Sequence, residues 1–224
     1  QGIASVAVGL NAGLDGQGLR SVAVGINSGQ TDQGSSAVAI GSSAGSNGQG
    51  SNSVAIGLQA GQSNQQVSAV SIGHVAAQFG QNNNSTAVGS YAGRQGQGSS
   101  AVAIGYFAGH TGQGGAAIAI GKEAGSNGQG VNSISIGNIA GSISQNTGCT
   151  AIGAIAGRYG QGNFANALGY QAGETAQGVA ATALGHQAAA VSQGNSATAV
   201  GRKAGFTTQG SNSVAVGAEA GSNN

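Results

Sequence analysis

The chain lacks proline, methionine and tryptophan, and Lys, Arg, Asp and Glu together make up only 5% of its 224 residues. A single cysteine, Cys149, excludes a disulfide framework within the chain. A collagen helix is excluded, because the chain has no proline and glycine does not occur at every third position. The net charge of +1 predicts no binding to nucleic acid or to an anionic membrane. The sequence contains no run of about 18 apolar residues, so it predicts no membrane-spanning helix.

Glycine is abundant, with 46 residues, and much of it recurs at a fixed interval. A glycine follows an apolar triplet at Gly9 and at every sixteenth residue as far as Gly217. A glutamine opens each unit in the same way, at Gln1, Gln17, Gln33, Gln49, Gln65, Gln81, Gln97, Gln113, Gln129, Gln145, Gln161, Gln177, Gln193 and Gln209. The chain is therefore 14 units of 16 residues with no insertion or deletion, and this strict period argues against disorder.

Within a unit, whose positions we number 1 to 16 from the glutamine, positions 4–8 alternate between small and aliphatic residues. Position 8 is always Val, Ile or Leu, position 6 is mostly Val or Ile, and positions 5 and 7 are nearly all Ala or Ser. This alternation predicts a β-strand over positions 4–8. Glycines at positions 2, 9 and 13 predict corners, and a second short strand is expected near positions 10–12.

These patterns predict an all-β fold, a parallel β-solenoid (β-roll) of 14 coils of 16 residues that forms a single domain over residues 1–224. We expect the chain to be a segment of a longer fibre, because it lacks the atypical end repeats that cap solenoids. Stacked coils would place the glutamines directly above one another. Since an amide side chain both donates and accepts hydrogen bonds, the column predicts a structural ladder, with a polar recognition strip as the alternative.

The strand over positions 4–8 has one aliphatic and one small face, and either face could line the coil. If Ala and Ser point inward, the aliphatic side chains form an exposed stripe larger than a monomer tolerates. That arrangement is favoured, and it predicts a homo-oligomer, with a trimer as the simplest closed form, or contact with neighbouring filaments. If Val and Ile point inward, the chain would instead be a stable monomer.

The strand motif recurs as SVAVG at 21–25, AVAIG at 37–41, NSVAIG at 52–57 and NSVAVG at 212–217. These segments resemble the head repeats of trimeric autotransporter adhesins, and similar repeats occur in some viral and phage fibres. The resemblance extends over all 14 units and implies a left-handed parallel β-roll that packs as a trimer. The family repeat is usually shorter, by the Gln-Gly corner, which favours a fibre relative over a standard adhesin head. No functional residue is carried over.

Catalytic and metal-binding residues are sparse. Asp15 and Asp32 are the only acidic pair on neighbouring coils, and solvated turn acids are the simpler interpretation. His74, His110 and His186 lie on separate coils and cannot share a metal ion within one chain. Cys149 stands in the Ala/Ser column as a small core residue. We therefore expect no enzyme activity and no cofactor.

Most aromatic and charged residues fall at positions 10, 11, 14 and 15, which we expect to form an outer rim. Tyr91 and Phe107 share position 11 on neighbouring coils and are expected to stack, with Tyr106 beside them. A surface contact patch is predicted at Val75, Tyr91, Tyr106, Phe107, Ile139 and Ile155. Such a patch could bind a host surface receptor or a glycan; the alternative is a stack that only shields the corner.

Two functions fit these features. The favoured one is a structural or adhesive fibre shaft, extracellular on a cell or virion surface, that attaches through many weak contacts along a rigid, repeated surface. The alternative is an ice-binding β-solenoid. Threonine occupies position 6 only at Thr86, Thr150, Thr182 and Thr198, so the regular threonine row of such a surface is incomplete.

Overall fold

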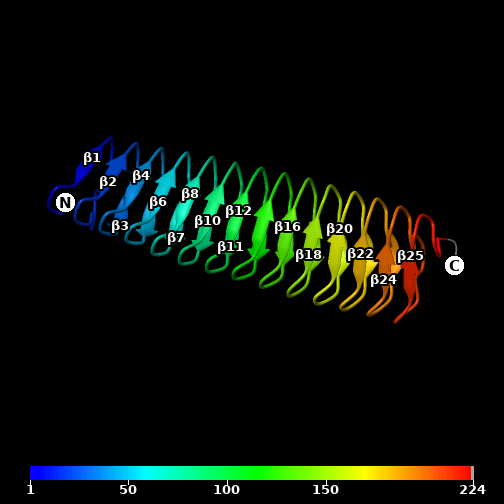
Figure 1. Cartoon of the computed structure of the whole chain (residues 1–224). Coiled ribbons are helices and arrows are strands. Elements are labelled where there is room, and N and C mark those ends of the chain that lie inside the picture. Colours follow the sequence, from blue (N-terminus) through cyan, green and yellow to red (C-terminus); the bar gives the residue numbers. More distant parts are fainter. Residues whose placement is uncertain (223–224) are drawn as a thin grey trace. The chain divides into compact units, whose positions relative to one another are not determined.

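The computed structural model describes residues 1–222, and over this range it consists of strands and turns without a helix. The chain divides into two compact units, Gln1–Gly115 and Ala116–Asn224. Each unit repeats the same 16-residue winding (Figure 1). The expectation of a single domain over residues 1–224 stays a prediction.

The first sheet of each unit is formed by positions 6–8 of successive coils. In the first unit its strands are β1 (Val6–Val8), β2 (Val22–Val24), β4 (Val38–Ile40), β6 (Val54–Ile56), β8 (Val70–Ile72), β10 (Thr86–Val88) and β12 (Val102–Ile104). In the second they are β14 (Ile118–Ile120), β16 (Ile134–Ile136), β18 (Thr150–Ile152), β20 (Asn166–Leu168), β22 (Thr182–Leu184), β24 (Thr198–Val200) and β25 (Val214–Val216). Neighbouring strands are parallel, and paired residues such as Val38 and Val54 are 16 apart in sequence. The predicted parallel β-solenoid is confirmed, and its left-handedness stays a prediction.

The second sheet of each unit is formed by positions 15 and 16 and the glutamine that follows. In the first unit its strands are β3 (Thr31–Gln33), β5 (Asn47–Gln49), β7 (Ser63–Gln65), β9 (Phe79–Gln81), β11 (Gln95–Gln97) and β13 (Thr111–Gln113). In the second they are β15 (Asn127–Gln129), β17 (Ile143–Gln145), β19 (Tyr159–Gln161), β21 (Thr175–Gln177) and β23 (Val191–Gln193). The prediction of a second strand near positions 10–12 is wrong. Residues at positions 11 and 13, such as Tyr91 (φ 59°) and Gly93 (φ 53°), are left-handed and close a turn there.

The strand of the first sheet is also shorter than predicted, covering positions 6–8 and not 4–8. Position 4 takes a left-handed conformation in coil after coil, with φ 58° at Asn52 and φ 57° at Ser100. This conformation cannot continue a strand. Position 4 therefore belongs to the corner, and the strand begins only after it.

The interior of each coil is filled by small side chains and by glutamine. Alanines at positions 7 and 12, such as Ala103 and Ala108, are fully buried, and Gln97 is fully buried as well. Ile104, at position 8, leaves 39% of its surface exposed. The small face therefore lines the coil, and the alternative with Val and Ile inside is wrong. A coil this narrow has no room for a large aliphatic side chain between its two sheets.

Position 9 requires glycine for two reasons, which Gly89 illustrates. Its φ of 127° lies in a region that side chains with a Cβ rarely adopt. A Cβ built there would also lie 2.7 Å from the carbonyl oxygen of Gly105, the same position one coil on. Backbone approach between coils thus explains why this glycine recurs in every unit.

Candidate functional site

Each unit presents one apolar sheet face, which we call the outer face: the side chains at positions 6 and 8 of the first sheet. Neither position carries a charged residue in any unit. Position 8 is the more exposed in several coils, with 39% at Ile104, 38% at Ile152 and 45% at Leu184. Alternation along a strand produces this arrangement, because residues on either side of a buried position 7 must point away from the coil. The outer face is therefore a continuous row of apolar side chains that stays partly exposed within each unit.

The parallel register makes the outer face regular, because each residue at position 6 pairs with the residues at position 6 of the neighbouring coils. The sixth coil carries a threonine there, and Thr86 pairs with Val70 on one side and with Val102 on the other. Later coils replace the aliphatic residue of position 6 with polar ones more often, Thr150 and Asn166 among them. The face is therefore more apolar in the first unit than toward the C-terminal end of the second.

The column of glutamines at position 1 lies inside the coils and not on a surface. From Gln17 to Gln209, each Nε2 atom donates to the carbonyl oxygen at position 6 of the preceding coil, at 2.7–3.2 Å. Several also donate to the Oε1 atom of the next glutamine, as Gln81 does to Gln97 at 3.2 Å and Gln161 to Gln177 at 2.9 Å. Apart from Gln1, which is exposed, these amides link the two sheets and are closed to a ligand.

An aromatic cluster occupies one corner of the first unit. Tyr91 and Phe107 stack with ring centroids 4.8 Å apart, as the repeat predicts, and Tyr106 meets Phe107 edge-on at 4.6 Å. The sequence did not single out His74 and His110 as members of this stack, yet they contact it, at 5.2 Å from Tyr91 and 4.5 Å from Phe107. Their place in the repeat could have indicated this contact, because His74 is at position 10 and His110 at position 14, and these positions meet position 11 of neighbouring coils at one corner.

Polar contacts fix this aromatic corner. Arg94 lies over the Tyr91 ring at 5.8 Å, and its Nε donates to the Gln78 side chain at 3.0 Å. His110 Nδ1 lies 3.0 Å from the Thr111 hydroxyl. Burial lowers the pKa of His110, and the positive charge of Arg94 lowers it further. Tyr91 and Phe107 cover each other's ring faces, so the half-exposed Tyr106 is the member that a ligand could reach most easily.

The predicted contact patch is not accessible at every one of its six residues. Val75 is only 4% exposed, so its assignment to an accessible patch is wrong: the turn folds its side chain against the coil. Tyr91, Tyr106 and Phe107 come together in the first unit. Ile139 and Ile155 belong to the second unit, half-buried at position 11 of neighbouring coils.

Ile139 and Ile155 adopt a conformation that their side chains disfavour. Their φ values are 60° and 63°, in the left-handed region, where a β-branched residue is a genuine outlier. Position 11 closes the turn in every coil, and Asn27 meets the same demand with a residue that tolerates it (φ 55°). The fold therefore imposes the turn, and the two isoleucines adopt a backbone conformation that is strained for their side chains.

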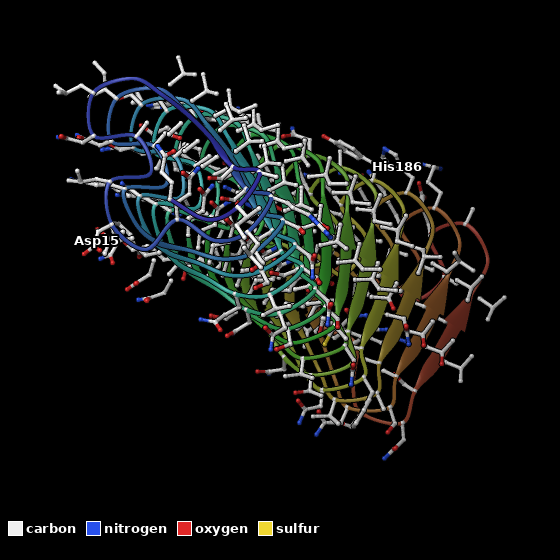
Figure 2. The ribbon with its side chains drawn as sticks, turned by 90° about the vertical axis from the view of Figure 1, so that its left-hand side faces the viewer. Asp15 and His186 are labelled. Carbon is white, nitrogen blue, oxygen red and sulfur yellow. The ribbon has the colours of Figure 1, made fainter. Side chains whose placement is uncertain are left out.

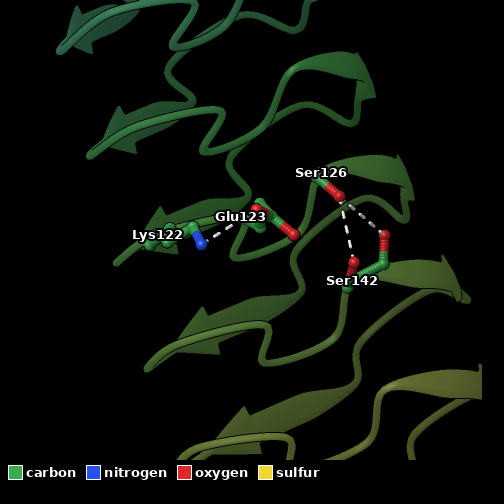
Figure 3. A network of polar contacts seen from close by, with 4 residues as sticks. All are labelled: Lys122, Glu123, Ser126 and Ser142. Carbon is green, nitrogen blue, oxygen red and sulfur yellow. Dashed lines mark hydrogen bonds and ion pairs between the residues drawn. The ribbon is translucent and has the colours of Figure 1, made fainter.

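Lys122 and Glu123 lie at the rim positions 10 and 11 and are partly exposed. Lys122 and Glu123 form an ion pair at 3.5 Å, and the neighbouring hydroxyls of Ser126 and Ser142 lie 3.0 Å apart (Figure 3). Exposed pairs of this kind contribute little to stability. Within residues 1–222, no three His, Cys, Asp or Glu side chains are grouped so that they could hold a metal ion.

The remaining candidates lie apart from these features. Asp15 and Asp32 are both exposed, and the Asp32 amide donates to the Asp15 carbonyl at 2.9 Å; Figure 2 shows the Asp15 side chain pointing away from its coil. His186 stacks on Tyr170 at 5.2 Å. Cys149 is fully buried, and burial raises the pKa of its thiol. In the part of the chain that the structure describes, no helix could cross a membrane.

Comparison with protein-family models, with curated proteins and with solved structures finds no match for this chain.

Proposed function

We propose that the chain is the shaft of a structural, adhesive fibre in which the outer faces of several copies, three in the simplest closed form, pack against one another. One observation carries the proposal: the large aliphatic side chains are exposed, while alanine and glutamine fill the coil. Ala103 is fully buried and Ile104, beside it, is 39% exposed. A repeat that keeps Val, Ile or Leu at position 8 in every unit places its largest apolar surface where only a partner can cover it.

The energy available to such an assembly follows from the exposed fractions. Fully burying an isoleucine side chain contributes about 1.5–3 kcal/mol, so covering the exposed two-fifths of one contributes about 1 kcal/mol. Position 8 repeats in every coil, so the contributions add along the outer face. The sum over one unit is several kcal/mol for each copy, which offsets much of the roughly 4–15 kcal/mol that association costs.

An extracellular location on a cell or virion surface, and the absence of enzyme activity, are parts of the same proposal. The resemblance of NSVAIG at 52–57 to adhesin head repeats supports them. Attachment to a host receptor or glycan would use exposed rim side chains such as Tyr106, repeated in each copy, so that weak contacts add by multivalency. Ice binding is the alternative, and a thermal hysteresis measurement on the purified chain distinguishes the two.

Light scattering on the wild-type chain and on two aspartate variants tests the assembly. Ile104→Asp places a charge in the outer face, whereas Ser99→Asp places the same charge on an exposed turn of the same coil as a control. We expect an oligomeric wild type, a marked loss of mass for Ile104→Asp, and no change for Ser99→Asp. A monomeric wild-type chain would overturn the proposal.

A further inference from the structure

The turn that opens the sixth coil contains a motif found nowhere else in the chain. Asparagine is followed two residues later by Ser or Thr only in Asn83-Asn84-Ser85 and in the overlapping Asn84-Ser85-Thr86. This is the acceptor motif for N-linked glycosylation, a modification of exposed loops in secreted proteins. Other asparagines at the same position of the repeat, such as Asn52, lack the hydroxyl residue because Val54 stands two residues on.

Asn84 is placed where a bulky glycan would fit without disturbing the coil. Asn84 is exposed, lies at position 4 of its unit, within the turn, and has φ 58°. Its backbone N–H donates to the Val67 carbonyl at 3.1 Å, so the backbone is held. In residues 1–222 its carboxamide makes no hydrogen bond. The residues at the same position in the neighbouring coils, Ser68 and Ser100, are small and exposed, which leaves space on both sides.

Of the two overlapping motifs, the one at Asn84 stays accessible after folding. Its hydroxyl residue, Thr86, is half-buried and belongs to the outer face. The motif at Asn83 depends on Ser85, which is fully buried and donates its hydroxyl to the Asn82 carbonyl. Asn83 also has a structural contact, since its Oδ1 accepts the Val67 N–H at 3.1 Å.

We propose that Asn84 is an N-glycosylation site. Its Nδ2 atom forms a bond to C1 of the first N-acetylglucosamine of a lipid-linked oligosaccharide. The bond from C1 to the lipid diphosphate breaks, the diphosphate departs as the leaving group, and the proton lost from Nδ2 passes to a base of the transferase. The inference rests on the proposed function, because only an exported chain meets such a donor. A glycan there keeps the turn around Asn84 facing solvent in the assembled fibre.

Expression of the whole chain behind a cleavable signal peptide in eukaryotic cells tests the site. We expect a mass shift that peptide N-glycosidase removes, leaving aspartate at position 84 in the peptide mass spectrum. Asn84→Gln and Thr86→Val should each abolish the shift, and Asn83→Gln should retain it. Val54→Thr creates the same motif at Asn52, whose φ is also 58°, and should add a second glycan.

The Val54→Thr variant makes a negative result decisive. If it is modified at Asn52 while Asn84 is not, the chain has met the transferase and Asn84 is not a site. If neither is modified, this turn is not an acceptor, and the proposal is equally overturned. A shift that persists in Thr86→Val would assign the glycan to Asn83 instead. The added signal peptide forces export, so failure here leaves the fibre proposal to the light-scattering test.

Discussion

Replacing Gln97 with alanine tests how much the buried glutamine column stabilises the fold. Strand β11 offers a matched control, because Gln95 has the same side chain two residues away but is exposed. Gln97 donates to the Thr86 carbonyl at 2.8 Å and to the Ala101 carbonyl at 3.3 Å. It also accepts from Gln81 at 3.2 Å. The variant loses all three bonds and leaves a void between the sheets.

The magnitude follows from these contacts. Three hydrogen bonds contribute about 1 kcal/mol each, and truncating a buried side chain of this size costs about 2–5 kcal/mol, a figure that includes the cavity left behind. Gln81 keeps a bond to the Val70 carbonyl at 2.8 Å, so its amide is not left unsatisfied. Together these contributions predict that Gln97→Ala lowers the free energy of unfolding by about 5–8 kcal/mol. Gln95→Ala, at an exposed site, should change it by less than about 0.5 kcal/mol.

Denaturant unfolding followed by circular dichroism measures both variants against the wild type. The reasoning requires a clear drop in the midpoint for Gln97→Ala and almost none for Gln95→Ala. If the two midpoints coincide, the column does not stabilise the coil, and the narrow interior must depend on alanine packing alone.

Gly89→Ala should strongly destabilise the chain, because the added Cβ meets the carbonyl of the next coil at 2.7 Å; Gly96→Ala, with no atom within 4 Å of the new Cβ, should cost only about 1–2 kcal/mol in chemical unfolding. Ile155→Asn should raise the melting temperature, because asparagine tolerates φ 63° better than a β-branched residue does. Burial lowers the pKa of His110, so its contribution to stability is present above the usual value of 6.5 and lost as the pH falls. His110→Gln should flatten this pH dependence of unfolding; an unchanged slope would contradict the assignment.

The sequence by itself determined the coil length, the parallel register and the glutamine column. Exact repetition every 16 residues forces identical side chains to stack, whatever the shape of the coil. It also predicted that Tyr91 and Phe107 would meet, since they occupy the same position on neighbouring coils. These features follow from the regular spacing of the repeat alone, so they can be predicted without knowing where the chain turns.

The tertiary structure decided what the repeat could not: where each corner lies and which face points outward. Position 11 is left-handed in every coil. Isoleucine, as at Ile139 and Ile155, favours a strand by its residue type, so a strand was expected where the structure has a turn. The narrow interior admits only small side chains and glutamine, which sends Ile104 outward. Steric fit between the two sheets, a property of the closed coil, made that choice.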